Sequence, residues 1–253
     1  MSFKVVIPSR LASVRLPDKP LQLLLGRPLV RHVYERAAVS GADEVIVATE
    51  SEKVVAACRA FDAQVVLTSP DHRCGTERVA EVADLRGWPD DTIIVNLQGD
   101  EPLMPTALVD QVAALIASTD TPIATLAWPL ESSEDMRNPN VAKVVLDAKG
   151  DALYFSRAPI PWNRDEPPTR EGASVTQALR HIGLYAYRAA ALRQVAAAPQ
   201  CELEEIEKLE QLRALYLGLR IRVGIARSLP GQEVNTPEDL ERVAALLGAR
   251  SGS

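Results

Sequence analysis

Cysteine is scarce in this chain, and its spacing excludes two common frameworks. The 253 residues contain three cysteines, Cys58, Cys74 and Cys201, with no C-x-x-C pair and no histidine cluster beside them. We therefore expect neither a disulfide framework nor a structural zinc site. Reduced thiols of this kind are typical of a cytoplasmic protein.

Long apolar runs and an excess of basic residues are also missing. No stretch reaches the roughly 20 apolar residues of a membrane-spanning helix, and the apolar run over residues 5–8 is too short for a signal peptide. The formal net charge of −6 argues against a nucleic-acid partner, which would need a basic surface. We expect a cytoplasmic globular protein without membrane insertion.

A glycine-rich phosphate loop is absent after the first predicted strand. The loop that follows residues 5–7 contains neither G-x-G-x-x-G nor G-x-x-x-x-G-K-[ST], and no glycine precedes Gly26. The loop instead carries three cations, Arg10, Arg15 and Lys19. It is stiffened by three prolines, Pro8, Pro17 and Pro20. Because arginine and lysine side chains bind phosphate oxygens, the loop predicts a polyphosphate site; the alternative is a loop of solvated surface cations.

Strands and helices alternate over the first half of the chain. Apolar periodicity predicts helices over residues 29–38 and 51–62, and strands over residues 44–49 and 64–68. This order predicts an α/β fold with a mainly parallel central sheet flanked by helices. Ligands of such sheets bind beyond the carboxyl ends of the strands, and the cationic loop follows one of these ends.

A turn-rich segment over residues 69–78 precedes a predicted helix. Its Gly75 allows a close backbone approach to a ligand base or sugar. Arg78 is either a ligand contact or a surface arginine in a salt bridge, and the local sequence does not distinguish these roles.

The predicted strand over residues 92–97 ends in Gln98-Gly99-Asp100-Glu101-Pro102. A carboxylate just beyond a central strand can bind Mg²⁺, which makes Asp100 a candidate metal ligand. The alternative is that Asp100 caps the turn before a helix over residues 105–116.

The second half of the chain breaks this alternation. Strands predicted over residues 123–129 and 141–146 are followed by a Lys149-Gly150 turn and another short strand, which together predict a hairpin. We expect the hairpin to belong to a smaller lobe that covers an acceptor substrate and pairs with a second subunit. A long loop over residues 159–176, rich in proline and charge, is a candidate lid, with disorder as the alternative.

The apolar pattern in the last third of the chain predicts a strand over residues 180–188, with His181 on the face opposite an apolar row. A lone histidine on a strand is more often a hydrogen-bonded structural residue than a catalyst, and the alternative is a ligand contact. A helix is predicted over residues 202–217, with Glu210 and Gln211 beside its apolar stripe, either at the edge of a pocket or on the helix surface. The stripe consists of Leu203, Ile206, Leu209, Leu212 and Tyr216. After a strand over residues 220–226, Thr236 and Pro237 are typical of the start of a terminal helix.

We expect one domain with two parts. The nucleotide-binding core covers about residues 1–130 and 217–248, and the acceptor and dimerisation lobe covers about residues 131–216.

Six segments together resemble the CMP-Kdo synthetase family, in register from about Phe3 to Val243. They are Ile7-Pro8-Ser9-Arg10 through Lys19-Pro20-Leu21, Cys74-Gly75-Thr76-Glu77-Arg78, Gln98-Gly99-Asp100-Glu101-Pro102, Tyr154-Phe155-Ser156-Arg157, Arg180-His181-Ile182-Gly183 and Leu209-Glu210-Gln211-Leu212-Arg213. The resemblance implies a nucleotide-diphospho-sugar transferase-like fold and a homodimer. It also implies that CTP and 3-deoxy-manno-octulosonate (Kdo) react, with Mg²⁺, to give CMP-Kdo and pyrophosphate for lipopolysaccharide biosynthesis.

The resemblance also implies roles for individual residues. CTP-binding positions are Pro8, Arg10, Arg15, Lys19, Cys74, Gly75, Arg78 and Gln98. Lys19, Arg10 and Asp100 are the implied catalytic residues. Kdo-binding positions are Gln98, Arg157, Arg164, His181, Tyr185, Glu210 and Gln211. The implied metal ligands are Asp100 and Asn235.

Asn235 departs from the family pattern, which has an aspartate ligand in the segment Val-Asp-Thr-Pro-Glu-Asp-Leu. Asparagine keeps an oxygen of similar reach but lacks the negative charge, so we expect a higher Mg²⁺ requirement. Two other functions stay open: cytidylyl transfer to another acidic or amino-substituted sugar, and nucleotide binding with weak catalysis.

Overall fold

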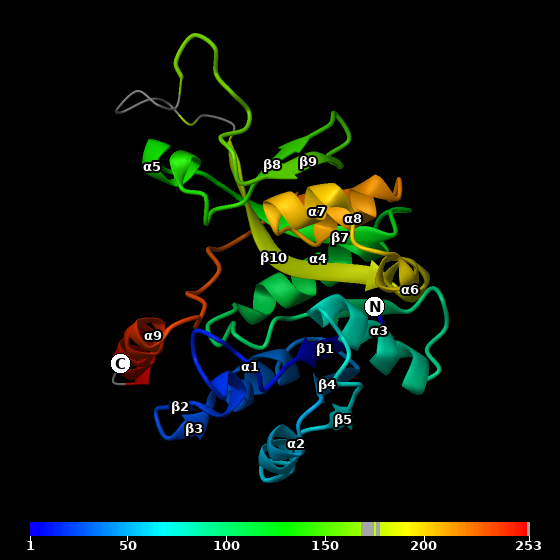
Figure 1. Ribbon diagram of the computed structural model, residues 1–253, viewed down its shortest axis with the longest axis vertical. Helices are drawn as coiled ribbons and strands as arrows, with labels where there is room; N and C mark the ends of the chain where they lie inside the picture. The colour runs from blue at the N-terminus through cyan, green and yellow to red at the C-terminus, as the bar shows by residue number, and fades with distance from the viewer. Residues whose placement is uncertain (168–174, 176–177, 252–253) are drawn as a thin grey trace.

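A mostly parallel sheet forms the centre of the molecule. The computed structural model describes residues 1–167, 175 and 178–251 (Figure 1). Seven strands of the sheet lie in the order β11-β7-β10-β6-β1-β4-β5, and β8 and β9 extend from β10. The strand bounds are β1 Lys4–Pro8, β4 Glu44–Thr49, β5 Val65–Leu67, β6 Ile93–Asn96, β7 Ile123–Pro129, β8 Lys143–Leu146, β9 Ala152–Ser156, β10 Leu179–Arg188 and β11 Ile221–Ile225.

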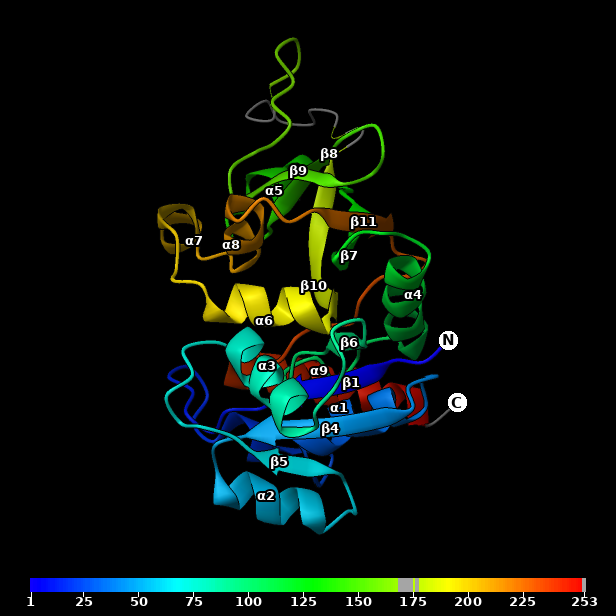
Figure 2. The same ribbon diagram turned by 90° about the vertical axis from the view of Figure 1, so that its right-hand side faces the viewer.

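One strand of the main order runs against the others. β10 is antiparallel to β6 and β7, whereas β6, β1, β4 and β5 pair in parallel, as do β7 and β11. Figure 2 shows the sheet from β5 at the bottom through β4, β1 and β6, with the β8–β9 hairpin at the top. The predicted α/β fold with a mainly parallel sheet is confirmed, and so is the hairpin.

Helices cover both faces of the sheet because alternate strand residues point to opposite sides. Val5 and Ile7 of β1 pack with α1, α2 and α4, whereas Val6 packs with α3, α6 and α8. Helix bounds are α1 Leu29–Ala38, α2 Glu52–Arg59, α3 Gly75–Leu85, α4 Thr106–Ala117, α5 Ser133–Arg137, α6 Ala189–Ala197, α7 Glu202–Glu207, α8 Gln211–Tyr216 and α9 Pro237–Ser251. No helix of the described residues is both long and apolar enough to cross a membrane.

A separate apolar cluster lies beneath the cationic loop. It joins Leu16 of the loop to Leu103, Val234 and Val243, and so connects the loop to α9. A 3₁₀ turn at Lys19–Leu21 and a small hairpin, β2 Leu23–Leu24 with β3 Arg27–Pro28, continue from this loop. The cluster brings together segments that are more than 200 residues apart in the sequence.

The prediction of one continuous helix over residues 202–217 is wrong. The chain forms two short helices, because Lys208 takes a left-handed conformation with φ of 53°. The Arg157 guanidinium donates to the carbonyl oxygens of Glu207 and Lys208, at 2.6 and 3.3 Å, and stabilises this break. The predicted apolar stripe is correspondingly divided: two of its members are buried and three are exposed, namely Leu203, Ile206 and Tyr216.

Other segments follow the predictions closely. The strands over residues 44–49 and 123–129 have the predicted bounds, and Thr236 Oγ1 accepts a bond from the Asp239 backbone N–H at 3.3 Å as the N-cap of α9. Helix α6 and the short α5 were not predicted. In the candidate lid over residues 159–176, residues 159–167 form neither helix nor strand, and residues 168–174 and 176 lie outside the described residues.

Candidate active site

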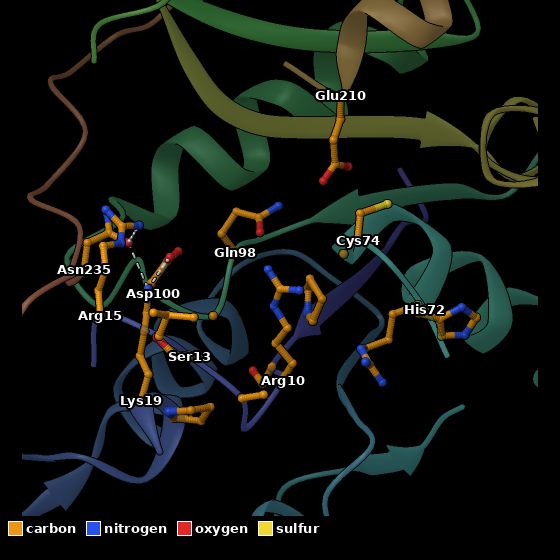
Figure 3. A pocket seen from close by; sticks show the side chains of 18 residues that line it. Arg10, Ser13, Arg15, Lys19, His72, Cys74, Gln98, Asp100, Glu210 and Asn235 are labelled. Carbon is orange, nitrogen blue, oxygen red and sulfur yellow. Dashed lines mark hydrogen bonds and ion pairs between the residues drawn. The ribbon is translucent and has the colours of Figure 1, made fainter. Parts of the chain in front are cut away.

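A pocket of about 740 Å³ opens beyond the carboxyl ends of β1 and β6 (Figure 3). Its walls come from the loop after β1, the start of α3, the turn after β6, the α7–α8 junction and the segment before α9. The lining residues are Pro8, Ser9, Arg10, Ala12, Ser13, Val14, Arg15, Lys19, Pro20, His72, Cys74, Gly75, Arg78, Gln98, Gly99, Asp100, Glu210 and Asn235. All predicted nucleotide-binding positions therefore meet at one pocket.

Cationic side chains form one wall of this pocket. Arg10 and Arg15 are solvent-exposed, and Lys19 is partly buried at the start of the 3₁₀ turn. Leu16, which lies between Arg15 and Lys19 in the sequence, is 4% exposed and anchors the loop in the apolar cluster below it. The loop is thus fixed by burial while its charged ends stay accessible to an anionic ligand.

Lys19 joins the loop to two oxygens from distant segments. Its Nζ donates to Asp100 Oδ2 at 2.7 Å and to Asn235 Oδ1 at 3.0 Å. Arg15 Nη2 donates to the same Asn235 oxygen at 3.0 Å. Asp100 therefore pairs with a cation, and the N-cap position of α4 is occupied by Pro105, which makes no side-chain cap.

The chemistry of these oxygens fits a hard cation. Asp100 and Asn235 present a carboxylate and an amide oxygen to one positive group, here the Lys19 ammonium. No group of three or more His, Cys, Asp or Glu side chains forms a metal site within the described part of the chain. Mg²⁺ commonly binds one or two protein oxygens and completes its shell with substrate phosphates and water, so this donor set suits it.

Two more carboxyl groups, Glu101 and Glu233, interact electrostatically with Asp100. Burial, then Glu233 and Asp100, raises the pKa of Glu101 well above its ordinary value, which favours its neutral form. Glu233, in contrast, is exposed to solvent.

Two glycines allow the strand ends to approach closely. A Cβ at Gly99 would lie 2.6 Å from Ser9 Oγ and 2.8 Å from the Pro8 carbonyl oxygen. A Cβ at Gly75 would lie 3.2 Å from Pro8 Cγ, so the predicted close approach at Gly75 is made to the protein's own β1 end. Beside Gly75, burial raises the pKa of the Cys74 thiol to about 11, which keeps it neutral near pH 7.

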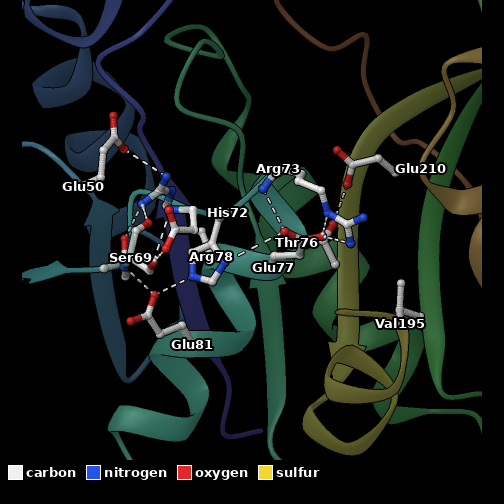
Figure 4. A network of polar contacts seen from close by, with 12 residues as sticks. Glu50, Ser69, His72, Arg73, Thr76, Glu77, Arg78, Glu81, Val195 and Glu210 are labelled. Carbon is white, nitrogen blue, oxygen red and sulfur yellow. Dashed lines mark hydrogen bonds and ion pairs between the residues drawn. The ribbon is translucent and has the colours of Figure 1, made fainter. Parts of the chain in front are cut away.

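Arg78 combines the two roles left open by the sequence. Its guanidinium pairs with Glu50 Oε2 at 3.0 Å and also hydrogen-bonds the Thr68 hydroxyl (Figure 4). The residue lines the pocket while only 3% exposed. The salt bridge is present, but it lies in the pocket floor rather than on the surface.

Among the described residues of the predicted smaller lobe, Glu210 lines the pocket. It comes from the α7–α8 junction, points downward between Gln98 and Cys74 in Figure 3, and accepts a hydrogen bond from Thr76 Oγ1 at 2.8 Å. Thr76 lies in the first turn of α3, so this bond ties the α7–α8 junction to α3. Sequence reasoning missed Thr76, whose place beside Gly75 was its only signal.

Apart from Gln98 and Glu210, the predicted sugar-binding residues do not line this pocket. The Arg157 guanidinium donates to the Glu207 and Pro139 carbonyl oxygens, at 2.6 and 2.7 Å. His181 is half-buried, with its ring against Phe155 and Nε2 3.1 Å from Thr125 Oγ1, and desolvation lowers its pKa to about 3. The remaining positions outside the lining are Arg164, Tyr185 and Gln211.

The sequence matches the cytidylyltransferase family over residues 4–221. Fold, pocket and this match define the class: the chain is a cytidylyltransferase. The 3-deoxy-manno-octulosonate cytidylyltransferases of Thioalkalivibrio sulfidiphilus and Vibrio parahaemolyticus are 52% and 50% identical to it. These alignments cover 98% and 99% of this chain and all of each relative. The chain belongs to the 3-deoxy-manno-octulosonate cytidylyltransferase family.

A solved structure supports the same relationship. The structure of a CMP:2-keto-3-deoxy-manno-octonic acid synthetase complexed with CTP is 38% identical, with a TM-score of 0.88 over 98% of this chain and 99% of that one. The predicted family is confirmed.

Proposed function

We propose that this enzyme transfers CMP from CTP to Kdo, giving CMP-Kdo and pyrophosphate, in the cytoplasm as a step of lipopolysaccharide biosynthesis. The main support is the full-length structural similarity to a synthetase complexed with CTP. The cationic side chains that line the pocket also suit a triphosphate. No other function is favoured by a specific feature of the site.

CTP would lie along the pocket from the cationic loop to the start of α3. Arg10 and Arg15 would hold phosphate oxygens, and Lys19 would lie nearest the α-phosphate. The cytidine would face the floor of the pocket, formed by Cys74, Gly75, Arg78 and Gln98.

The reaction replaces one bond to phosphorus by another. The anomeric hydroxyl oxygen of Kdo attacks the α-phosphorus, the bond from that phosphorus to the β-phosphate oxygen breaks, and the hydroxyl proton leaves to solvent. Two anions must meet, so the residues act chiefly by positioning and by offsetting charge. Lys19 carries the charge that faces the developing negative oxygens.

Asp100 and Asn235 would hold Mg²⁺ beside Lys19. When bound, Mg²⁺ would supply positive charge at the triphosphate and lower the pKa of a coordinated hydroxyl. Lys19 rests against both oxygens and would move toward the phosphates when they are occupied.

Kdo would enter between the core and the smaller lobe, where Glu210 offers a carboxylate to its hydroxyls. Arg157, Arg164, His181, Tyr185, Gln98 and Gln211 stay proposed as further contacts. A homodimer is also proposed, because the same lobe exposes large apolar side chains on α7, α8 and β9. These are Leu153, Leu203, Ile206 and Tyr216.

Incubation with CTP, Mg²⁺ and a panel of acidic sugars, followed by pyrophosphate measurement, tests the function. Release with Kdo supports it. Release only with a different acidic or amino-substituted sugar would overturn the acceptor assignment, and CTP binding without release would overturn the activity.

A further inference from the structure

Asn235 is held at both ends of its side-chain amide. On one side, Oδ1 accepts from Lys19 Nζ and Arg15 Nη2, each at 3.0 Å. On the other side, Nδ2 donates to Glu233 Oε2 at 2.9 Å. The backbone N–H of Asn235 is held as well, by Asp239 Oδ2 at 2.9 Å.

This arrangement fixes which amide atom faces the pocket. If the amide were rotated by half a turn, its NH₂ group would face two cations and its oxygen would face the Glu233 carboxylate. Both contacts would be repulsive, because lysine and arginine have no acceptor and an ionised carboxylate has no donor. Glu233 therefore selects the orientation in which the oxygen of Asn235 is offered to a cation.

Glu233 also places a negative charge beside the proposed metal ligands. Asn235 is neutral, and Asp100 is the one charged residue of the proposed ligand pair. The Glu233 carboxylate contacts the amide directly, with Oε2 2.9 Å from Asn235 Nδ2. A carboxylate behind a neutral ligand polarises the ligand oxygen and attracts the cation that it binds.

We infer that Glu233 is a positioning residue for the metal half of the site, orienting Asn235 and supplying the negative charge that Asn235 lacks. The inference rests on the proposed function, because it concerns the cation that would accompany CTP. Glu233 has no contact with the reacting atoms in this role and acts through Asn235.

Glu233→Gln tests this role with little change of shape. The glutamine oxygen can still accept from Asn235 Nδ2, so the variant removes charge while leaving the hydrogen bond possible. Glu241→Gln is the matched control, since Glu241 is an exposed residue of α9 and is absent from the pocket lining. Free Mn²⁺ would be followed by electron paramagnetic resonance in the presence of saturating CTP. Metal-free CTP binding would be followed by calorimetry.

We expect Glu233→Gln to weaken Mn²⁺ binding by about three- to tenfold, in the range of a partly screened charge interaction. Metal-free CTP should bind equally well or more tightly, because a negative charge near the triphosphate has been removed. Adding Asn235→Asp to Glu233→Gln should restore Mn²⁺ affinity. Glu241→Gln should match the wild type in both measurements.

Unchanged Mn²⁺ affinity in Glu233→Gln would overturn the inference. Parallel weakening of Mn²⁺ and metal-free CTP would also overturn it, because a local structural defect would have that effect. If the wild type binds no Mn²⁺ with CTP and releases no pyrophosphate with Kdo, the proposed function itself is wrong. If it does both and only the variant result fails, the role of Glu233 alone is wrong.

Discussion

The cationic wall of the pocket and the lobe above it hold their polar side chains in different ways. Arg10 is exposed to solvent, and Arg15 and Lys19 contact side chains that a triphosphate and its cation could displace. In the lobe, the Arg157 guanidinium is bonded to backbone carbonyls, and the His181 ring packs against the rings of Phe155 and Tyr185. The charged side chains of the pocket wall are thus available to a ligand, whereas those of the lobe, apart from Glu210, stabilise the fold. Variants in the two regions should therefore fail differently.

The largest effect is expected for Lys19→Met, which keeps the apolar stem of the side chain and removes its charge. Losing a preorganised cation at a developing charge should lower kcat by about 100- to 1000-fold, with little loss of stability. Pyrophosphate release and thermal unfolding would be measured together. Lys53→Met, at an exposed position of α2, is the control. A kcat within about threefold of wild type would show that Lys19 is not a catalytic residue.

His181 should affect the stability of the fold as the pH falls. Burial lowers its native pKa to about 3, so below pH 6.5 the unfolded chain binds a proton that the folded chain does not. Stability is therefore lost as the pH falls from about 6.5 toward 3. Between pH 7 and 5, wild type should lose about 2 kcal/mol more than His181→Gln in urea unfolding. Equal losses in the two proteins would show that His181 is not buried as a neutral group.

Asn235→Asp should lower the Mg²⁺ concentration needed for half-maximal activity by about fivefold, because it adds a formal charge to a ligand oxygen. A Mg²⁺ titration of pyrophosphate release at saturating CTP would measure it. If both activity and Mg²⁺ dependence stay unchanged, Asn235 is not a metal ligand.

Cys74→Ser should have the smallest effect, less than about twofold on the KM for CTP, because a neutral, half-buried thiol and a hydroxyl differ little at this helix start. Iodoacetamide should label Cys74 slowly at pH 7, because the thiol stays protonated. Rapid labelling, read by peptide mass spectrometry, would contradict the protonated thiol.

The parts of the site near strand ends were predictable from the sequence. Parallel strands deliver their carboxyl ends to one edge, so the loop with Arg10 and the turn with Asp100 had to lie near each other. The joining of Asn235 to Lys19 was different, because it depends on the apolar cluster of Leu16 and Val234, which no periodicity within either segment indicates.

The helix break at Lys208 was also hidden from local sequence. The surrounding residues favour a helix, but Arg157, fifty residues earlier, binds the carbonyl oxygens at the break. Tertiary contacts of this kind override local propensity. The same break places Glu210 at the pocket, so its position could be stated from family resemblance but not worked out from helical spacing.

Transfer of the α-phosphorus of CTP is the central claim, and labelled CTP tests it most directly. With Kdo and Mg²⁺, label at the α-phosphorus should appear in a nucleotide-sugar product, and label at the γ-phosphorus should appear in pyrophosphate. Label from the γ-position in orthophosphate, or α-label that never joins the sugar acid, would contradict the proposed reaction.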